Sequence, residues 1–223
     1  MPAERNTINQ FDRVAPLYDF LASLVFGRSL QQAQLIFLSS IPKGASVLLA
    51  GGGTGALLEQ LIRTCEPQRV LYLDLSAKMV DKASQRMIRN GLLGTVEFRV
   101  GNILELQAAE PFDVIMTPFL LDLFTPTTLQ KQLIPSLINN LKTNGLWLIT
   151  DFIRPNVWWQ KALLEIMIRF FRITANIETH QLADWQLLLA ETQLIRTRQA
   201  RAVKGMVSAE VWTYPNKAST GND

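Results

Sequence analysis

The stretch Val47-Leu-Leu-Ala-Gly-Gly-Gly-Thr-Gly55 decides the fold of this chain. A short apolar run leads directly into a glycine-rich turn, and a helical pattern over 56–64 follows the turn. A continuous apolar run is typical of a strand buried on both faces, and glycines let the backbone turn sharply and lie close to a ligand. The free N–H groups at the start of the next helix attract anionic groups. The stretch therefore predicts a strand–turn–helix unit that binds a ligand.

Similar apolar runs alternate with helical patterns along the rest of the chain. We expect strands at 46–50, 69–74, 96–100, 112–117 and 146–152, the last preceded by a turn at Asn144-Gly145. We expect helices at 56–64, at 76–89 with Ser76 as N-cap, at 125–141 with a kink at Pro135, near 157–173 and at 181–191. Strands separated by helices imply right-handed crossovers and a parallel sheet.

The two ends of the chain complete the predicted architecture. Segments 194–201 and 206–214 flank a turn at Lys204-Gly205 and predict two strands that form an antiparallel hairpin. Two helices within 7–40 form an N-terminal cap. The fold class is therefore a three-layer α/β fold with a seven-stranded, mostly parallel sheet. We expect a single domain over 1–223, with the cap at 7–40, the core at 45–214 and a loose tail at 215–223.

Composition excludes several classes of protein. With 223 residues, 48% of them hydrophobic, the chain is long enough to bury a sizeable core. The net charge is only +3 and the basic residues are scattered, so we expect no nucleic-acid partner. Cys65 and His180 are the single cysteine and the single histidine, so we expect neither an intramolecular disulfide nor a metal site. Because no leader and no apolar run of about 20 residues is visible, we expect a cytoplasmic protein without an integral membrane segment.

In a purely structural interpretation, the glycine turn only closes the corner between a strand and a helix. In the alternatives, the turn binds a nucleoside-containing ligand. Asp74 ends the next strand, where a carboxylate accepts hydrogen bonds from ribose hydroxyls. The pattern Gly51-x-Gly53-x-x-Ala56 also satisfies the dinucleotide fingerprint, so a nicotinamide-dependent oxidoreductase is one alternative. The long helical segment before the first strand and the absence of a Tyr-x-x-x-Lys pair disfavour it.

Six segments, in order along the chain, carry a resemblance to a known family. They are Phe11-Asp-Arg-Val-Ala-Pro-Leu-Tyr-Asp19, Val47–Gly55, Leu73-Asp-Leu-Ser76 with Met79, Gly101-Asn-Ile103, Phe112-Asp-Val-Ile-Met-Thr117 and Leu141–Asp151. Their order and spacing resemble the class I S-adenosylmethionine-dependent methyltransferases, which implies the Rossmann-like methyltransferase fold. The first segment is similar to the start of the ubiquinone/menaquinone biosynthesis C-methyltransferase subgroup.

The resemblance implies S-adenosylmethionine as the cofactor and a set of residues in contact with it. These residues are Gly51, Gly53 and Gly55 beside the methionine part, Asp74 at the ribose, Leu75, Asn102 and Ile103 at the adenine, Thr117 and Phe119 near the sulfonium, and Tyr18, which closes over the site. Leu49 departs from the family pattern, because an acidic residue usually stands two positions before the first glycine. That departure keeps open the alternative of a non-catalytic binding protein with a methyltransferase fold.

Methyl transfer needs a general base only when the acceptor must lose a proton. The candidates for a base or a positioning group are Asp122 after the fourth strand, Asp151 at the end of the fifth, and His180. Capping or a place in a solvated loop is the alternative for each of them. We expect a small, hydrophobic or aromatic acceptor that is methylated at carbon or oxygen. The aromatic-rich segment 157–172 fits an acceptor pocket, a peripheral membrane contact, or core and homodimer packing equally well.

Overall fold

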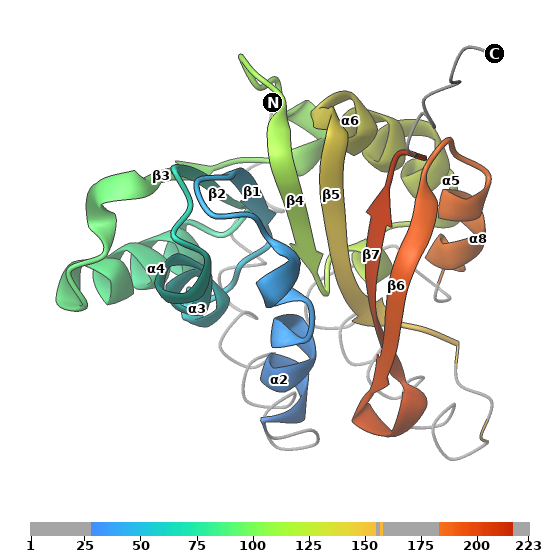
Figure 1. The fold of residues 1–223 in the computed structure, drawn as a ribbon, viewed down its shortest axis with the longest axis horizontal. Helices are drawn as coiled ribbons and strands as arrows, with labels where there is room; N and C mark the ends of the chain where they lie inside the picture. Colours follow the sequence, from blue (N-terminus) through green and yellow to red (C-terminus); the bar gives the residue numbers. More distant parts are fainter. Residues whose placement is uncertain (1–27, 155–156, 158–182, 216–223) are drawn as a thin grey trace, which may run out of the picture.

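The computed structural model describes residues 28–154, 157 and 183–215. Within these residues, seven strands form one sheet in the order β3-β2-β1-β4-β5-β7-β6. The pairs from β3 to β5 are parallel, whereas β7 is antiparallel to both β5 and β6. This arrangement confirms the predicted mostly parallel sheet with an antiparallel C-terminal hairpin (Figure 1).

Most of the strands have the bounds that their apolar runs predict, to within a residue at each end. They are β1 (Ser46–Ala50), β2 (Arg69–Asp74), β3 (Val96–Val100), β4 (Phe112–Pro118), β5 (Leu141–Phe152), β6 (Ile195–Ala202) and β7 (Val207–Thr213). The order of the parallel strands reverses between β1 and β4. Ligands of open α/β sheets bind beyond the carboxyl ends of the strands at such a reversal.

The helices cover both faces of this sheet (Figure 1). They are α2 (Ser29–Leu35), α3 (Ala56–Cys65), α4 (Ala77–Arg89), α5 (Pro126–Thr128), α6 (Ile134–Asn139) and α8 (Trp185–Ala190). One apolar core joins α3 and α4 to one face through Leu49, Tyr72 and their neighbours. The other joins α6 and α8 to the opposite face through Leu48, Trp147 and their neighbours. The result is the three-layer architecture that the sequence predicts.

The helix ends follow local capping chemistry. Ser76 is the predicted N-cap of α4, and its hydroxyl accepts a hydrogen bond from the backbone N–H of Met79. The helix predicted at 181–191 is shorter in the described residues: α8 begins at Trp185, and the side chain of Asp184 caps it by accepting from the N–H of Leu187. The segment 125–141 is broken by a π-helical turn, Leu129–Leu133, directly before Pro135.

The predicted turn at Asn144-Gly145 was wrong, because β5 already begins at Leu141. Leu141 pairs with Phe112 and Leu146 with Val114, so β5 uses more residues than β4 between these pairs. Of the additional residues in this bulge, Lys142, Thr143 and Asn144 are exposed and Gly145 is buried, and the exposure explains their polar, turn-like sequence. A Cβ on Gly145 would lie 2.6 Å from Cδ1 of Leu141, so glycine lets the bulge fold back on the strand.

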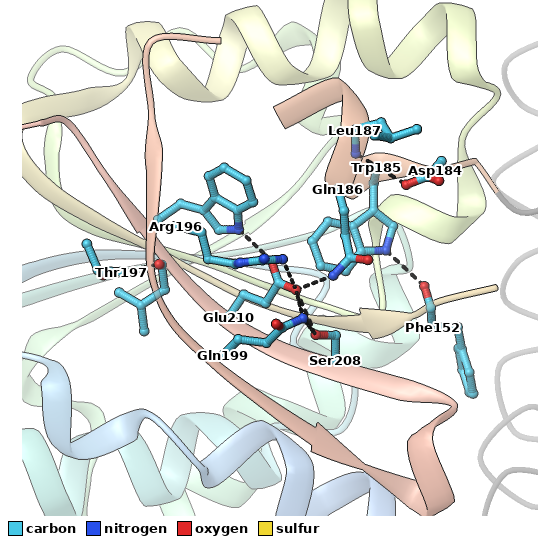
Figure 2. A network of polar contacts seen from close by, with 12 residues as sticks. Phe152, Asp184, Trp185, Gln186, Leu187, Arg196, Thr197, Gln199, Ser208 and Glu210 are labelled. Atoms are coloured by element: carbon cyan, nitrogen blue, oxygen red, sulfur yellow. Dashed lines mark hydrogen bonds and ion pairs between the residues drawn. The ribbon is translucent and has the colours of Figure 1, made fainter. Parts of the chain in front are cut away.

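A buried polar network joins the C-terminal hairpin to α8 (Figure 2). Glu210 on β7 is fully buried, and its carboxylate accepts hydrogen bonds or an ion pair from five side chains. The donors are Gln186, Arg196, Gln199, Ser208 and Trp212. The indole N–H of Trp185 in α8 donates to the backbone oxygen of Phe152 at 2.9 Å, so α8 is also held to the carboxyl end of β5.

Gly55 allows α3 and α4 to approach closely. Its φ is +80°, and a Cβ at this position would lie 2.8 Å from Cα of Ala83 in α4. Both the left-handed backbone and the lack of space therefore favour glycine here. Gly91 has a similar φ of +66°, but a Cβ there would meet nothing within 4 Å.

We predict that Gly55→Ala lowers the free energy of unfolding by about 3 kcal/mol, because backbone strain and overpacking add. The matched variant Gly91→Ala removes the same backbone freedom without the steric overlap. It should lower the free energy of unfolding by only about 1 kcal/mol. Urea denaturation followed by circular dichroism measures both. Equal losses in the two variants would show that contact with α4 does not require glycine at position 55.

Candidate functional site

The glycine turn after β1 is held by polar groups from β2. The N–H of Gly51 donates to the backbone oxygen of Leu73 at 2.8 Å, and the N–H of Gly53 donates to the carboxylate of Asp74 at 3.3 Å. The hydroxyl of Tyr72 donates to the backbone oxygen of Gly53. Gly51 and Gly53 have φ values of +73° and +61°, which only glycine adopts readily. A Cβ on Gly53 would meet nothing within 4 Å, so there is room beside the turn for a ligand.

Leu49 stands where the family resemblance implies an acidic residue, and the structure shows the surroundings of Leu49 and of its neighbour Tyr72. Leu49 is fully buried among the side chains that join α3 and α4 to the sheet. Tyr72 is equally buried, and its ring lies 5.4 Å from that of Phe98. In this chain the Tyr72 hydroxyl makes one polar contact to the glycine turn, beside those of Leu73 and Asp74. Sequence reasoning missed Tyr72 because it lies within an apolar strand, where its ring alone explains its presence.

Asp74 and Asn102 end neighbouring strands on one side of the glycine turn. The carboxylate of Asp74 also accepts from the N–H of Ser76 at 2.9 Å, which places it at the start of α4. The side-chain oxygen of Asn102 accepts from the N–H of Leu104 at 3.0 Å. Leu75 is half-buried, and Ile103 is almost fully buried. The structure thus brings the residues predicted for the ribose and the adenine to one edge of the sheet, and their contacts with the cofactor stay predictions.

On the other side, the turn after β4 lies against the glycine turn. Phe119 has a φ of +50°, which is unusual for a residue other than glycine. The next residue, Leu120, contacts Gly51: its Cδ1 is 3.3 Å from the position that a Cβ on Gly51 would occupy. The hydroxyl of Thr117 is buried and accepts from the indole N–H of Trp147 at 2.9 Å. The roles of Thr117 and Phe119 near the sulfonium remain predictions.

Asp151 and Asp122 differ in their hydrogen bonding. Asp151 is fully buried, and its carboxylate accepts backbone N–H groups from Leu120, Leu121 and Phe152 at 3.1, 2.8 and 2.7 Å. Asp122 belongs to the 3₁₀ helix Leu121–Leu123 and is partly buried. Its Oδ1 is buried and has no hydrogen-bond partner in the described part of the chain. Sequence reasoning treated the two residues alike, whereas in the described part of the chain backbone donors occupy the carboxylate of Asp151 and leave Oδ1 of Asp122 without a partner.

The two carboxyls also differ in the groups that shift their pKa values. Burial raises the pKa of Asp122 from its ordinary value of 3.8 to about 7. Burial and then the charge of Asp122 raise the pKa of Asp151, whereas its backbone N–H donors lower it. Because those donors stabilise the charged form, we assign the proton of the pair to Asp122 near neutral pH. Asp122 can therefore gain or lose a proton in the range where general bases work.

Two predicted site residues, Tyr18 and His180, lie outside the described residues, and so does segment 157–172 except for Val157. Their predicted roles therefore stay predictions.

We predict that Tyr72→Phe weakens binding of S-adenosylhomocysteine about fivefold, because it removes a hydrogen bond worth about 1 kcal/mol and keeps the buried ring. Isothermal titration measures this affinity. Tyr214→Phe is the matched control: its hydroxyl donates to the backbone oxygen of Ile138, away from the glycine turn. Equal affinities of the wild type and Tyr72→Phe would exclude a role for this hydroxyl in forming the site.

Sequence comparisons agree with this geometry. Residues 47–145 match the family model described as a methyltransferase domain. The chain is 30% identical over 219 residues to the ubiquinone/menaquinone biosynthesis C-methyltransferase UbiE of Azotobacter vinelandii, covering 95% of this chain and 85% of that protein. It is 26% identical over 204 residues to the protein of the same name from Stutzerimonas stutzeri, covering 89% and 78% of the two chains.

Comparison with solved structures supports the fold. The N-methyltransferase NodS from Bradyrhizobium japonicum, solved with S-adenosylhomocysteine, superposes with a TM-score of 0.64 at 19% identity, covering 86% of this chain and 89% of that one. An O-methyltransferase family protein from Burkholderia thailandensis superposes with a TM-score of 0.72 at 17% identity, covering 92% of this chain and 60% of that one.

These findings decide between the interpretations left open by the sequence. The match to the curated relatives extends over nearly the whole chain, and the seven-stranded sheet is the one that the methyltransferase resemblance implies. The nicotinamide alternative is therefore set aside. In the described residues, no helix has the length and apolar character that a membrane crossing requires. The chain belongs to the class I S-adenosylmethionine-dependent methyltransferases.

Proposed function

We propose that this methyltransferase methylates a ring carbon of a hydrophobic, hydroxylated aromatic acceptor, with Asp122 as the general base. S-adenosylmethionine supplies a methyl group that its sulfonium activates. The new carbon–carbon bond forms as the carbon–sulfur bond breaks, and the electron pair of that bond stays on sulfur. The acceptor loses one proton, which the proposal assigns to the carboxylate of Asp122.

The observation that carries this proposal is Oδ1 of Asp122, which is buried and has no hydrogen-bond partner among the described residues. A buried carboxylate oxygen without a partner is unfavourable, so a functional ligand or proton is a good reason to keep one. Asp122 lies two residues beyond Leu120, which contacts Gly51. With a pKa of about 7, it accepts a proton from a phenol or an activated ring carbon more readily than an exposed aspartate does.

The surroundings of the turn favour an apolar acceptor. The rings of Phe119 and Phe152, at the carboxyl ends of β4 and β5, lie 5.3 Å apart. Phe152 belongs to a small apolar cluster with Leu30 and Met206, and Phe119 packs against it. The curated relatives described above carry C-methyltransferase and quinone biosynthesis in their names, which supports carbon over oxygen and a quinol ring as the acceptor class.

We predict that turnover rises with pH through about 7, because Asp122 must lose its proton before it can act as a base. Asp122→Asn should lower kcat about 100-fold and remove this pH dependence, with the affinity for S-adenosylhomocysteine unchanged. The measurement is transfer of a labelled methyl group to a naphthohydroquinone that carries a hydrophobic tail, between pH 5.5 and 8.5. Mass spectrometry of the product locates the methyl group.

Thermal unfolding tests the protonation state separately. The folded-state pKa of Asp122 lies above its ordinary value of 3.8, so stability falls as pH rises from that value through about 7. Asp122→Asn should therefore become more stable than the wild type above pH 7. Asp81→Asn is the control, since Asp81 is exposed on α4. Full turnover of Asp122→Asn would eliminate Asp122 as the base, and a methyl group on oxygen would contradict the carbon assignment.

A further inference from the structure

Asp151 has the geometry of a residue that acts through others. Both of its carboxylate oxygens accept backbone N–H groups: Oδ2 accepts from Leu120 and Leu121, and Oδ1 accepts from Phe152. Its side chain is fully buried. A carboxylate that is surrounded by backbone donors and closed off from solvent does not reach an acceptor. Such charge-assisted hydrogen bonds are, however, among the strongest that fix a backbone turn.

The turn that Asp151 holds needs such support. Phe119 has a left-handed φ of +50°, and its N–H donates to the backbone oxygen of Thr150 at 2.7 Å. Strained backbone persists where surrounding contacts over-determine it, and such positions cluster at functional sites. Thr150 and Asp151 are adjacent in β5, so one strand end fixes three successive N–H groups of the turn, from Phe119 to Leu121.

The same turn connects the two halves of the site. The side chain of Leu120 packs against Gly51 of the glycine turn, and Asp122 lies two residues further along. The position of this turn therefore determines both how the glycine turn is supported and where the carboxylate of Asp122 lies.

We propose that Asp151 is a positioning residue that seats Leu120 against the cofactor loop and sets the place and charge environment of Asp122. The part of this inference that concerns catalysis rests on the proposed role of Asp122, whereas the part that concerns the cofactor loop does not.

The charged groups around Asp151 are few in the described part of the chain. Asp122 is the group whose charge acts on it. On the neighbouring strand β7, Glu210 is ion-paired with Arg196. On β4, Asp113 lies at the opposite end of the strand, where it binds Lys142 and Ser46. Removal of the Asp151 charge should therefore be felt mainly by Asp122.

The test compares Asp151→Asn with the wild type by two measurements that do not need an acceptor. Isothermal titration should show that S-adenosylhomocysteine binds about tenfold more weakly, because an amide cannot accept all three N–H groups and Leu120 shifts from Gly51. Carboxyl carbon NMR should show that Asp122 titrates at lower pH, because a neighbouring negative charge is gone. If Asp122 is the base, the rise of kcat with pH moves in the same direction.

Asp113→Asn is the matched control, because Asp113 also accepts a backbone N–H, from Ser46 at 2.9 Å, but at the other end of the sheet. It should lower the melting temperature without changing the affinity for S-adenosylhomocysteine or the titration of Asp122. If Asp151→Asn does not fold, Leu120→Ala separates the two effects: it should weaken S-adenosylhomocysteine binding and leave the Asp122 titration in place.

A folded Asp151→Asn that binds S-adenosylhomocysteine like the wild type and keeps the Asp122 titration would overturn the inference, as would wild-type affinity in Leu120→Ala. Both readouts remain decisive when no acceptor is methylated, so a failure of the proposed function is distinguishable from a failure of the positioning role.

Discussion

Each turn at the carboxyl edge of the sheet is held by polar groups of the adjacent strand, and the site depends on this constraint. Tyr72 and Asp74 of β2 bind the glycine turn that follows β1. Thr150 and Asp151 of β5 bind the turn that follows β4. Both turns contain left-handed backbone, which would relax without these partners. The two turns then meet where Leu120 contacts Gly51, so the glycine turn and the turn after β4 support each other.

This arrangement also distinguishes the two aspartates, of which Asp151 is fully buried and Asp122 is partly buried. Backbone donors occupy the carboxylate of Asp151, and they stabilise its charge. In the described part of the chain, Oδ1 of Asp122 has no hydrogen-bond donor, and burial raises the pKa of Asp122 to about 7. In the proposed mechanism, the structural carboxylate of Asp151 lies beside Asp122, the base that titrates near neutral pH. For the methyl transfer itself, the main contribution of the protein is to align the two reactants.

The sequence predicts the strands well, because runs such as Ser46–Ala50 are mostly apolar and lie between turn residues. It predicts the start of β5 wrongly, since the bulge there has the polar composition of a turn. The glycine turn, Asp74, Asn102, Asp122 and Asp151 were named as candidates from their places after strands or from the family resemblance, and their contacts with cofactor and acceptor stay predictions. The hydrogen bonds of Tyr72 and the backbone partners of Asp151 were not predicted, because they form only when distant segments come together.

The most direct test of this account is isothermal titration of S-adenosylhomocysteine into the wild type and into Asp74→Ala, with Asp81→Ala on the exposed side of α4 as the control. Asp74 both closes the glycine turn and ends the strand at the predicted ribose position. The account predicts saturable binding by the wild type and the control, and binding more than tenfold weaker by Asp74→Ala, a loss of about 1.4 kcal/mol. Equal affinity in all three proteins would show that the cofactor does not lie on the turn between β1 and β2.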